Sequence, residues 1–573
     1  MKSIKWILNY LKPYSFKYGL AMLLVFLGAG LNMVNPMLSG KIIDDVMNGS
    51  NKQLLVPILL MMIGVVVIKG MTSYTYQLMF EFVSQDIMFQ LREQCYTKLM
   101  TLDFNFYHAT RTGDLMTRLT GDIETIRYFI ASVIYSIFSN ILVFIFAVVY
   151  MLSISPLLTI SLLLITPVIA MLTIKMSKEV GPTFHQIREA YSSLNSVVQE
   201  NISGNRVVKA FAREAYEIEK FEKENLNYRE KNLASSRIWQ KYLPVLDSSA
   251  GALSVIMIFI GGILVMNQMM TLGDIVVFNG LIWALNNPMR MAGWLVNDVQ
   301  RFIAAGDKIR DLLDANTKLE QVQDPVSIPK IKGNIKFENV SFSYGDELVL
   351  DDVSFEVKSG QTVGIIGPTG SGKSTLVNLI TRFYDATKGN IFVDGINIKQ
   401  LDLTSYRKQI GTSLQDIFLF SDTIEGNIAF SDCHAEFEQV LKVSDIAQAN
   451  DFITQLPEQY DTIIGERGVG LSGGQKQRIS LARALLTEPS ILILDDTTSA
   501  VDMETEHAIQ LKLNTVLNNR TNFIIAHRIS SVKDADIIMV LKDGKIIETG
   551  THESLMEQQG YYYHVYQTQI SHS

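Results

Sequence analysis

Apolar residues are concentrated in the first half of the chain. Six apolar runs there approach the roughly 20 residues that a helix needs to cross the hydrocarbon core of a bilayer. The runs cover residues 18–36, 54–76, 129–152, 157–174, 248–266 and 275–295. We therefore predict an α-helical membrane domain with six transmembrane helices over residues 1–306.

Two long segments between these runs have a different pattern. Apolar residues recur at helical spacing among charges through residues 80–100 and 189–243, which predicts that the membrane helices continue beyond the bilayer. Each extension contains a turn-rich break, at residues 104–113 and 203–214. A break of this kind is either a simple hairpin tip or a short coupling helix that rests on a separate domain.

The pattern changes after a charged linker at residues 307–332. Residues 334–343 and 349–357 alternate apolar and polar positions, and residues 361–366 are apolar enough for a buried strand. That strand leads directly into a glycine-rich loop followed by a predicted helix. We expect residues 333–573 to form an α/β nucleotide-binding domain.

The glycine-rich loop has the residues of a phosphate-binding loop. Its glycines allow backbone amides to point at phosphates, and the helix that follows presents its positive N-terminus. Lys373 is expected to reach the β- and γ-phosphates and Ser374 to bind Mg²⁺. The predicted nucleotide contacts in this loop are Gly367, Pro368, Thr369, Gly370, Ser371, Gly372, Lys373, Ser374 and Thr375.

Composition and charge agree with a membrane protein of more than one domain. The 573 residues are 48% hydrophobic and 19% charged, which is apolar for a soluble protein. Lys and Arg lie before the first run and in the two long segments, whereas the turns at 153–156 and 267–274 have none. Because basic residues stay on the cytoplasmic side of short loops, we expect both termini in the cytoplasm. Disulfides and a metal site at Cys95 and Cys433 are not expected.

A second anion-binding element lies further along the chain. Ser472, Gly473, Gly474 and Gln475 open a predicted helix over residues 476–486, and the apolar strand 491–494 then ends at Asp495 and Asp496. A Ser-Gly-Gly loop at a helix N-terminus can bind another phosphate. One nucleotide cannot satisfy both loops of one monomer, which indicates a site shared between two subunits.

In this order of elements the chain resembles the exporters of the ATP-binding cassette family over essentially its whole length. The resemblance implies ATP and Mg²⁺ as cofactors. It implies that Tyr344 stacks on adenine, that Gln415 and Asp495 join Ser374 at Mg²⁺, and that His527 lies near the γ-phosphate.

The resemblance also places Asp502 in the loop that communicates across the dimer, and Ser472–Gln475 on the ATP of the partner. Glu466 and Arg467 resemble a segment that contacts coupling helices, or form a solvated surface pair.

Asp496 departs from the family pattern, which has glutamate at this position. A carboxylate must be positioned to orient the attacking water, and a displacement of about 1 Å can cost roughly 100-fold in rate. The chain resembles the degenerate subunit of bacterial heterodimeric multidrug exporters. We therefore predict poor hydrolysis at its own site and a related but distinct half-transporter as partner. The alternative is a homodimer in which Asp496 is the functional carboxylate.

Substrate identity is the least constrained part of the prediction. The predicted spans contain polar residues, of which Lys69 and Arg290 either line a cavity or extend to the inner interface. Met and aromatic residues supply adaptable apolar walls. We expect export of lipophilic compounds from a cell that carries the protein in its plasma membrane, with no nucleic-acid partner. A lipid flippase, a metal-chelate importer and a non-transporting regulator or gated channel are the alternatives.

Overall fold

The computed structural model describes residues 2–49, 51–320, 322–517 and 520–571. The chain divides into two compact units. Unit 1 contains Met1–Thr101 and Thr110–Ala315, and unit 2 contains Leu102–Ala109 and Asn316–Ser573. The short segment between the two parts of unit 1 therefore belongs with the second half of the chain.

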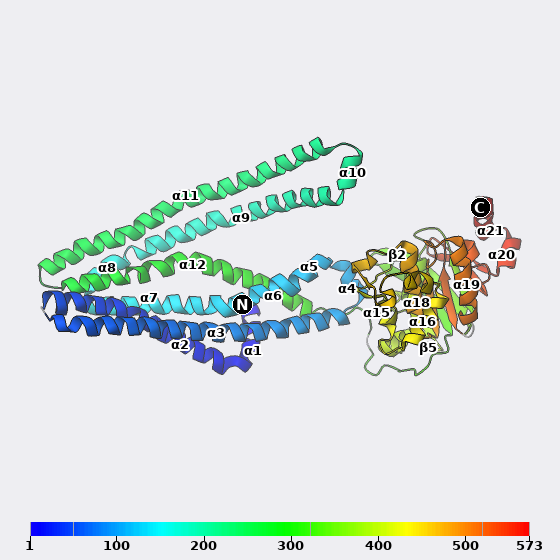
Figure 1. The fold of residues 1–573 in the computed structure, drawn as a ribbon, viewed down its shortest axis with the longest axis horizontal. Helices are drawn as coiled ribbons and strands as arrows, with labels where there is room; N and C mark the ends of the chain where they lie inside the picture. Colours follow the sequence, from blue (N-terminus) through cyan, green and yellow to red (C-terminus); the bar gives the residue numbers. More distant parts are fainter. Residues whose placement is uncertain (1, 50, 321, 518–519, 572–573) are drawn as a thin grey trace. The chain divides into compact units, whose positions relative to one another are not determined.

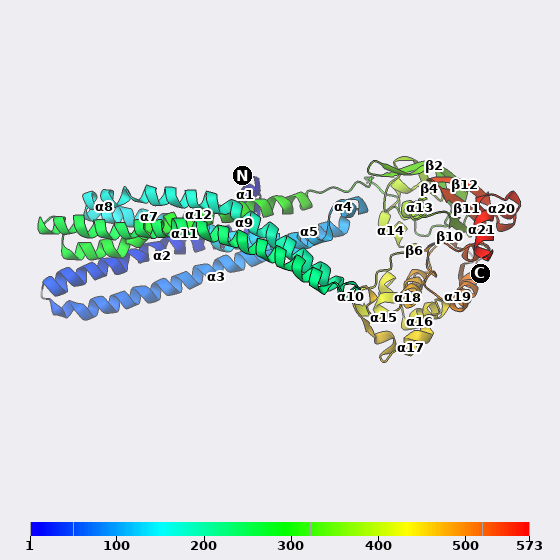
Figure 2. The ribbon, with the colours of Figure 1, turned by 90° about the horizontal axis from the view of Figure 1, so that it is seen from above.

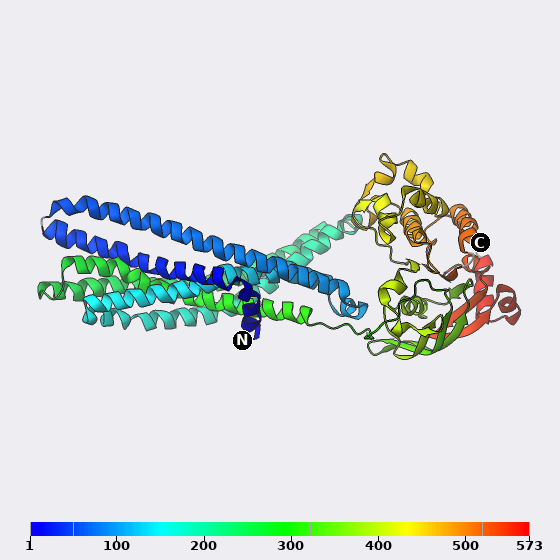
Figure 3. The same ribbon diagram turned by 90° about the horizontal axis from the view of Figure 1, so that it is seen from below.

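Long helices make up the described part of unit 1. Figure 1 shows α9 and α11 lying side by side as a hairpin with α10 at its tip, and Figure 3 shows α2 beside α3. The helices are α1 (Lys2–Leu11), α2 (Ser15–Lys41), α3 (Leu55–Thr101), α5 (Thr112–Thr117), α6 (Ile123–Tyr128), α7 (Ile134–Ile154), α8 (Pro156–Leu163), α9 (Thr166–Ser203), α10 (Asn205–Ala210), α11 (Glu214–Met266) and α12 (Leu272–Leu313).

The six predicted spans fall within the long helical segments of unit 1. Five helices in the described residues are long and apolar enough to cross a membrane. They cover Lys2–Asn48, Lys52–Thr101, Thr112–Ile154, Pro156–Ser203 and Glu214–Met266. The sixth predicted span lies in α12, where Asn279, Asn286, Asn287 and Arg290 interrupt the apolar sequence. Several helices extend far beyond the predicted spans, which confirms the helical extensions.

The fourth predicted span is not a single continuous helix. It is divided between α8 and α9 by a turn at Leu164 and Ile165. Pro167 lies in the first turn of α9. A proline has no amide hydrogen to donate, so it is tolerated in the first turn of a helix, and helices commonly begin anew at such a position. Helical periodicity alone did not reveal this break.

Unit 2 is built around two main sheets. Strands β2, β1, β4 and β5 form an antiparallel sheet in that order, and the larger sheet has the order β12-β11-β3-β10-β9-β6. A small pair, β7 and β8, completes the described strands. Their bounds are β1 (Ile335–Tyr344), β2 (Glu347–Val357), β3 (Thr362–Ile366), β4 (Lys388–Val393), β5 (Ile396–Asn397), β6 (Ile410–Ser413), β7 (Asp422–Thr423), β8 (Ile463–Ile464), β9 (Ile491–Asp495), β10 (Thr521–Ile525), β11 (Ile537–Lys542) and β12 (Lys545–Gly550).

The larger sheet is parallel except at β12. β10 lies between β3 and β9, with Ile525 opposite both Ile365 and Asp495. All side chains of β9 are buried, as expected for a strand covered on both faces. Three predicted strands, at 334–343, 349–357 and 361–366, are confirmed as β1, β2 and β3 within one or two residues.

The helices of unit 2 fall into two groups. In Figure 2, α15 to α18 gather in one lobe, whereas α13 lies with β2 and β4 in the other. Each lobe has its own hydrophobic core. The helices are α4 (Phe104–Ala109), α13 (Lys373–Ile380), α14 (Leu403–Arg407), α15 (Ile424–Ile428), α16 (Phe437–Ile446), α17 (Asn450–Thr454), α18 (Gly473–Leu486), α19 (Met503–Leu517), α20 (His552–Gln558) and α21 (Tyr561–Ser571).

The first predicted break, 104–113, contains the short helix α4, which packs within unit 2. The Phe104 ring lies 4.5 Å from the Phe383 ring, centroid to centroid. Asp103, which precedes α4, is 6% exposed and accepts hydrogen bonds from Lys318 N (2.6 Å) and Thr317 Oγ1 (3.2 Å) in the linker. The first break is therefore a short helix on the nucleotide-binding unit. The second break contains α10, which belongs to unit 1.

Burial acts to raise the pKa of Asp103, but hydrogen bonds from Lys318, Asn105, Phe106 and Thr317 outweigh it and hold the pKa below its usual value. A carboxyl whose pKa is depressed by folding stabilises the fold at pH values above its unfolded-state pKa. That contribution is lost as the pH falls through the folded-state pKa. The carboxylate is thus the stabilising form at neutral pH.

We expect Asp103→Asn to lower the stability of the full-length protein, because hydrogen bonds to a charged acceptor contribute about 1.5–3 kcal/mol. The difference in thermal unfolding midpoint between variant and wild type should be constant from pH 8 to pH 5 and should shrink only in strong acid. Asp461→Asn, at an exposed position of unit 2, is the control. Equal midpoints for Asp103→Asn and wild type at pH 7 would contradict this role.

Candidate functional site

The phosphate loop, residues 367–375, joins β3 to α13. Gly367, Gly370 and Gly372 have φ values of 154°, 80° and 98°, a region that favours glycine. A side chain at Gly367 would collide with the Leu541 carbonyl oxygen, and one at Gly372 would lie 2.7 Å from Leu350 Cδ2. Gly370 faces open space. The loop is therefore a close backbone turn that a bulkier sequence could not adopt.

Lys373 is folded back onto the loop. Its Nζ donates hydrogen bonds to the carbonyl oxygens of Gly367 (2.9 Å) and Pro368 (2.8 Å), and the residue is 7% exposed. Burial lowers the pKa of Lys373, while the charges of Asp495 and Asp496 act in the opposite direction. A buried cation at the start of a helix, beside the backbone amides of the loop, is suited to an anionic ligand.

Ser374 and Asp495 form the polar pair beside the lysine. The Ser374 side chain is close enough to the Asp495 carboxylate, which is 4% exposed, to favour its charged form. Burial raises the pKa of Asp495, opposed by Ser374 and by the charges of Lys373 and His527. Ser371 Oγ is buried and has no hydrogen-bond partner among the described residues. These oxygens fit a phosphate and a hard cation such as Mg²⁺, which prefers carboxylate, hydroxyl and water ligands.

The sheet brings the remaining predicted residues to the same edge. β3, β10, β9 and β6 are parallel neighbours, so their carboxyl ends meet, and ligands of such sheets bind at that edge. The phosphate loop follows β3, His527 follows β10, and Asp495 ends β9. Gln415 is exposed and lies two residues beyond β6, whose Ser413 is opposite Leu494.

Tyr344 reaches the loop from the other sheet. It ends β1, and its hydroxyl lies 3.5 Å from Thr375 Oγ1. The ring is half-buried and packs edge-on against Phe342 and Tyr384, with centroid distances of 4.8 and 5.2 Å. An aromatic ring beside a phosphate loop can stack on a nucleotide base.

Asp496 has a fixed backbone. Its φ is 52°, in the left-handed region that Asp tolerates better than most residues. Its amide donates to the Ile525 carbonyl (3.0 Å), and its own carbonyl accepts from Gln477 Nε2 (3.0 Å) and Ser499 Oγ (3.2 Å). The main chain at this position is therefore held from both sides.

The Ser-Gly-Gly loop lies in the helical lobe. Ser472 caps α18: its Oγ accepts from Gln475 N (3.3 Å), and its own amide donates to Gln475 Oε1 (2.8 Å). Gly474 leaves little room, since a side chain there would lie 2.8 Å from the Ala500 carbonyl. Ser472 and Gly473 are exposed, so the capped N-terminus of α18 is open to a ligand.

Two buried residues that connect segments of the site were not predicted from the sequence. Gln477 is 7% exposed, donates to Asp496 O and Ser499 Oγ, and accepts from Ala500 N (3.0 Å). Glu506 is 6% exposed and accepts from Thr498, Ser531 and Arg528. Polar residues within helical segments are normally solvated, and no local pattern indicates that these two are buried. They link the segment 496–500 to α18 and to the residues after His527.

Asp502 and the segment at Glu466 have local structural roles. Asp502 Oδ1 accepts from Thr505 N (2.9 Å), and this hydrogen bond lowers the pKa of Asp502. Glu466 and Arg467 are both exposed. Arg467 has a φ of 57°, and its carbonyl accepts from Lys476 Nζ (2.9 Å). The segment is therefore hydrogen-bonded to α18.

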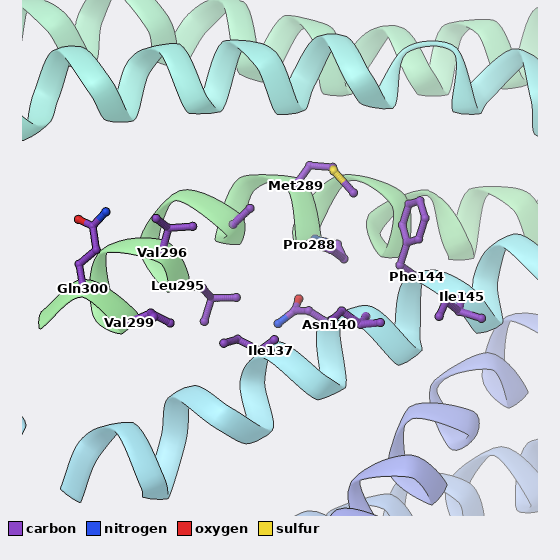
Figure 4. Close-up of a pocket in the computed structure, with 12 residues that line it drawn as sticks. Ile137, Asn140, Phe144, Ile145, Pro288, Met289, Leu295, Val296, Val299 and Gln300 are labelled. Carbon is purple, nitrogen blue, oxygen red and sulfur yellow. The ribbon is translucent and has the colours of Figure 1, made fainter. Parts of the chain in front are cut away.

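A second candidate site lies in unit 1. A pocket of about 590 Å³ lies between α7 and α12 (Figure 4). Its volume is within the range of small-molecule sites. Its walls are almost wholly apolar, and Asn140 and Gln300 supply the polar side chains. The lining residues are Ile137, Asn140, Ile141, Phe144, Ile145, Pro288, Met289, Ala292, Leu295, Val296, Val299 and Gln300.

The two basic residues of the predicted spans differ in their surroundings. Arg290 follows the pocket residue Met289 and forms an ion pair with Asp247, with Nη1 and Oδ1 3.1 Å apart. Lys69 is exposed on α3. Arg290 is thus neutralised by a neighbouring helix of unit 1.

Comparisons with known proteins cover both units. A family model described as "ABC transporter transmembrane region" matches residues 18–289, and one described as "ABC transporter" matches residues 350–499. YknU, an uncharacterized ABC transporter ATP-binding protein of Bacillus subtilis (strain 168), is 40% identical over 99% of this chain and 98% of its own.

Two further relatives have functional names. An ATP-dependent lipid A-core flippase of Syntrophus aciditrophicus (strain SB) is 33% identical over 100% of this chain and 95% of its own. YgaD, a candidate multidrug export ATP-binding/permease protein of Bacillus subtilis (strain 168), is 32% identical over 99% and 100%. A solved structure of a bacterial Atm1-family ABC exporter with ATP bound superimposes with a TM-score of 0.82, at 27% identity, over 97% of this chain and 98% of that one.

We expect Gln477→Ala to destabilise the protein, because it leaves the Ala500 amide without its acceptor and removes one of the two donors to the Asp496 carbonyl. An unsatisfied buried polar group costs about 1–3 kcal/mol. The thermal unfolding midpoint should fall relative to wild type and to Gln455→Ala, which changes an exposed glutamine of the same lobe. If the two variants unfold at the same temperature, the side chain of Gln477 is not the link we describe.

Proposed function

Because the chain belongs to the ABC transporter family, as a half-transporter exporter with a membrane region and an ATPase domain, we propose that it exports lipophilic or amphipathic compounds as one subunit of a heterodimer. ATP binding and ATP-driven transport are the activity of the family. The partner subunit, the degenerate site and the substrate class are specific to our proposal.

The fixed backbone at Asp496 carries the heterodimer proposal. Hydrogen bonds to Ile525, Gln477 and Ser499 prevent the main chain from advancing to compensate for a short side chain. Relative to glutamate, the carboxylate is drawn back by about one C–C bond, roughly 1.5 Å. A displacement of that size can cost roughly 100-fold or more in rate. The site of this chain would then bind ATP and hydrolyse it slowly.

The Ser-Gly-Gly loop supports the second half of the heterodimer proposal. Its cap is intact, Ser472 and Gly473 are exposed, and its core is separate from that of the phosphate loop. We propose that Ser472, Gly473, Gly474 and Gln475 complete the ATP site of a related but distinct half-transporter. That partner would supply the catalytic glutamate that this chain lacks.

We propose that the residues at the edge of the larger sheet and Tyr344 bind MgATP. Lys373 and the amides of residues 367–375 would hold the phosphates, Tyr344 the adenine, and Ser374, Asp495 and Gln415 the Mg²⁺ ion. Bound MgATP supplies the phosphoanhydride bond whose hydrolysis drives transport. Asp496 and His527 lie at the edge of the sheet where the γ-phosphate would be placed, and Asp496 orients the water less well than glutamate would.

The substrate proposal rests on the pocket between α7 and α12. Its apolar walls favour a lipophilic body, and Asn140 and Gln300 offer neutral hydrogen bonds to a polar group. The name of the lipid A-core flippase relative favours a second candidate substrate, a membrane lipid. The distribution of Lys and Arg supports cytoplasmic termini, and we propose that the protein lies in the plasma membrane.

The heterodimer proposal predicts an asymmetric response to two substitutions in this chain. Gly473→Asp places a negative charge against the phosphates of the partner's ATP and should nearly abolish steady-state ATPase activity of the purified complex. Asp496→Asn should change it little, since its own site contributes little turnover. Asp496→Glu should raise activity by restoring hydrolysis at that site.

The same measurement distinguishes the homodimer. If this chain, purified without a second half-transporter, hydrolyses ATP rapidly, Asp496 is a functional carboxylate. General-base catalysis is worth about 100-fold to 10,000-fold, so Asp496→Asn would then be as inactive as Gly473→Asp. Either result would refute the degenerate site.

The substrate proposal predicts that filling the pocket impairs transport. Ala292→Trp should weaken, by about tenfold, the stimulation of ATPase activity by an uncharged lipophilic dye in proteoliposomes, because the ring occupies volume that the dye requires. Val149→Trp, at a position of α7 that is 61% exposed, is the matched control. Flipping of a labelled phospholipid in the same vesicles tests the lipid alternative. Unchanged dye stimulation in Ala292→Trp would exclude the pocket as the dye site.

A further inference from the structure

Helix α4 brings His108 into the group of aromatic rings around Tyr344. The His108 ring centroid lies 5.9 Å from that of Tyr344, with an interplanar angle of 62°, and 5.9 Å from that of Tyr384. His108 Nδ1 also lies 3.1 Å from the Tyr384 hydroxyl oxygen, within hydrogen-bonding distance. His108 therefore contacts Tyr344 directly and also through Tyr384.

Tyr384 is the fixed member of this group. It is 3% exposed, and its ring packs edge-on against Tyr344 at 5.2 Å and 87°. Burial raises the pKa of Tyr384 to about 12, so the hydroxyl is protonated and able to donate to His108. A buried, hydrogen-bonded tyrosine limits the positions that the adjacent Tyr344 ring can adopt.

The position of His108 is set by its helix. Asp103 fixes the start of α4 to the linker through Lys318 N and Thr317 Oγ1, and Phe104 packs on Phe383. His108 is itself exposed. The side chain is thus held against the rings while one side remains accessible.

We propose that His108 is a positioning residue for the purine base of the bound nucleotide. With Tyr384 it fixes the plane of the Tyr344 ring on which the base stacks, because the energy of an aromatic stack depends on ring orientation. The inference rests on the proposed role of Tyr344. It makes α4, which leads from α3 to α5, a part of the base site.

The test compares a ligand that has a base with one that has none. Dissociation constants for a nonhydrolysable ATP analogue and for inorganic tripolyphosphate are measured with Mg²⁺ on the full-length protein. His108→Ala should weaken binding of the analogue by about threefold to tenfold and leave tripolyphosphate binding unchanged. Tyr384→Phe, which keeps the ring and removes the hydroxyl, should show the same selective loss. His434→Ala, at another exposed histidine of unit 2, should bind both ligands as the wild type does.

Four results would overturn the inference. Equal weakening of both ligands by His108→Ala would indicate a general effect on the fold. Wild-type binding by Tyr384→Phe would show that His108 does not act through the Tyr384 hydroxyl. The third result is that Tyr344→Ala selectively weakens binding of the ATP analogue whereas His108→Ala does not. In that case the proposed role of Tyr344 would stand and the role of His108 would not. If Tyr344→Ala itself shows no selectivity, the proposed base contact fails and the inference fails with it.

Discussion

The parallel pairing of β3, β10, β9 and β6 is the constraint on which the nucleotide site depends. Parallel strands place all their carboxyl ends at one edge, so a loop after each strand contributes to one site. Ile525, opposite both Ile365 and Asp495, sets the level of the phosphate loop relative to the acidic pair. A slip of one residue in this register would turn Asp495 to the other face of the sheet.

The same register explains why one methylene group can matter at residue 496. In a loop, a shorter acid could be compensated by a small backbone shift. Here the amide of Asp496 continues the hydrogen bonding of β10, and its carbonyl is bound by Gln477. The position of the carboxylate is therefore determined by the length of the side chain. Asp also suits the left-handed backbone at this position, so the substitution is compatible with the fold while it alters the chemistry.

Much of this arrangement could be predicted from local sequence signals. The phosphate loop, the helix that opens after Ser472, the β9 strand and five of the membrane helices follow from glycine spacing and apolar runs. Gln477, Glu506 and Asp103 could not be predicted in this way, because their partners are distant in the sequence or depend on tertiary burial. The turn at Leu164 and Ile165 was missed because the apolar pattern continues through it, although Pro167 was a visible signal.

The carboxylate of Asp103 has a consequence for the mechanics of the chain. The polypeptide passes between the two units after Thr101, after Ala109 and after Ala315. Asp103 joins the segments beside the first and third of these crossings by hydrogen bonds to Thr317 and Lys318. Asp103 thus connects two points of the chain that lie more than 200 residues apart in the sequence. A force on the end of α3 and a force on the end of α12 therefore act on the same point, a few residues from the rings that surround Tyr344.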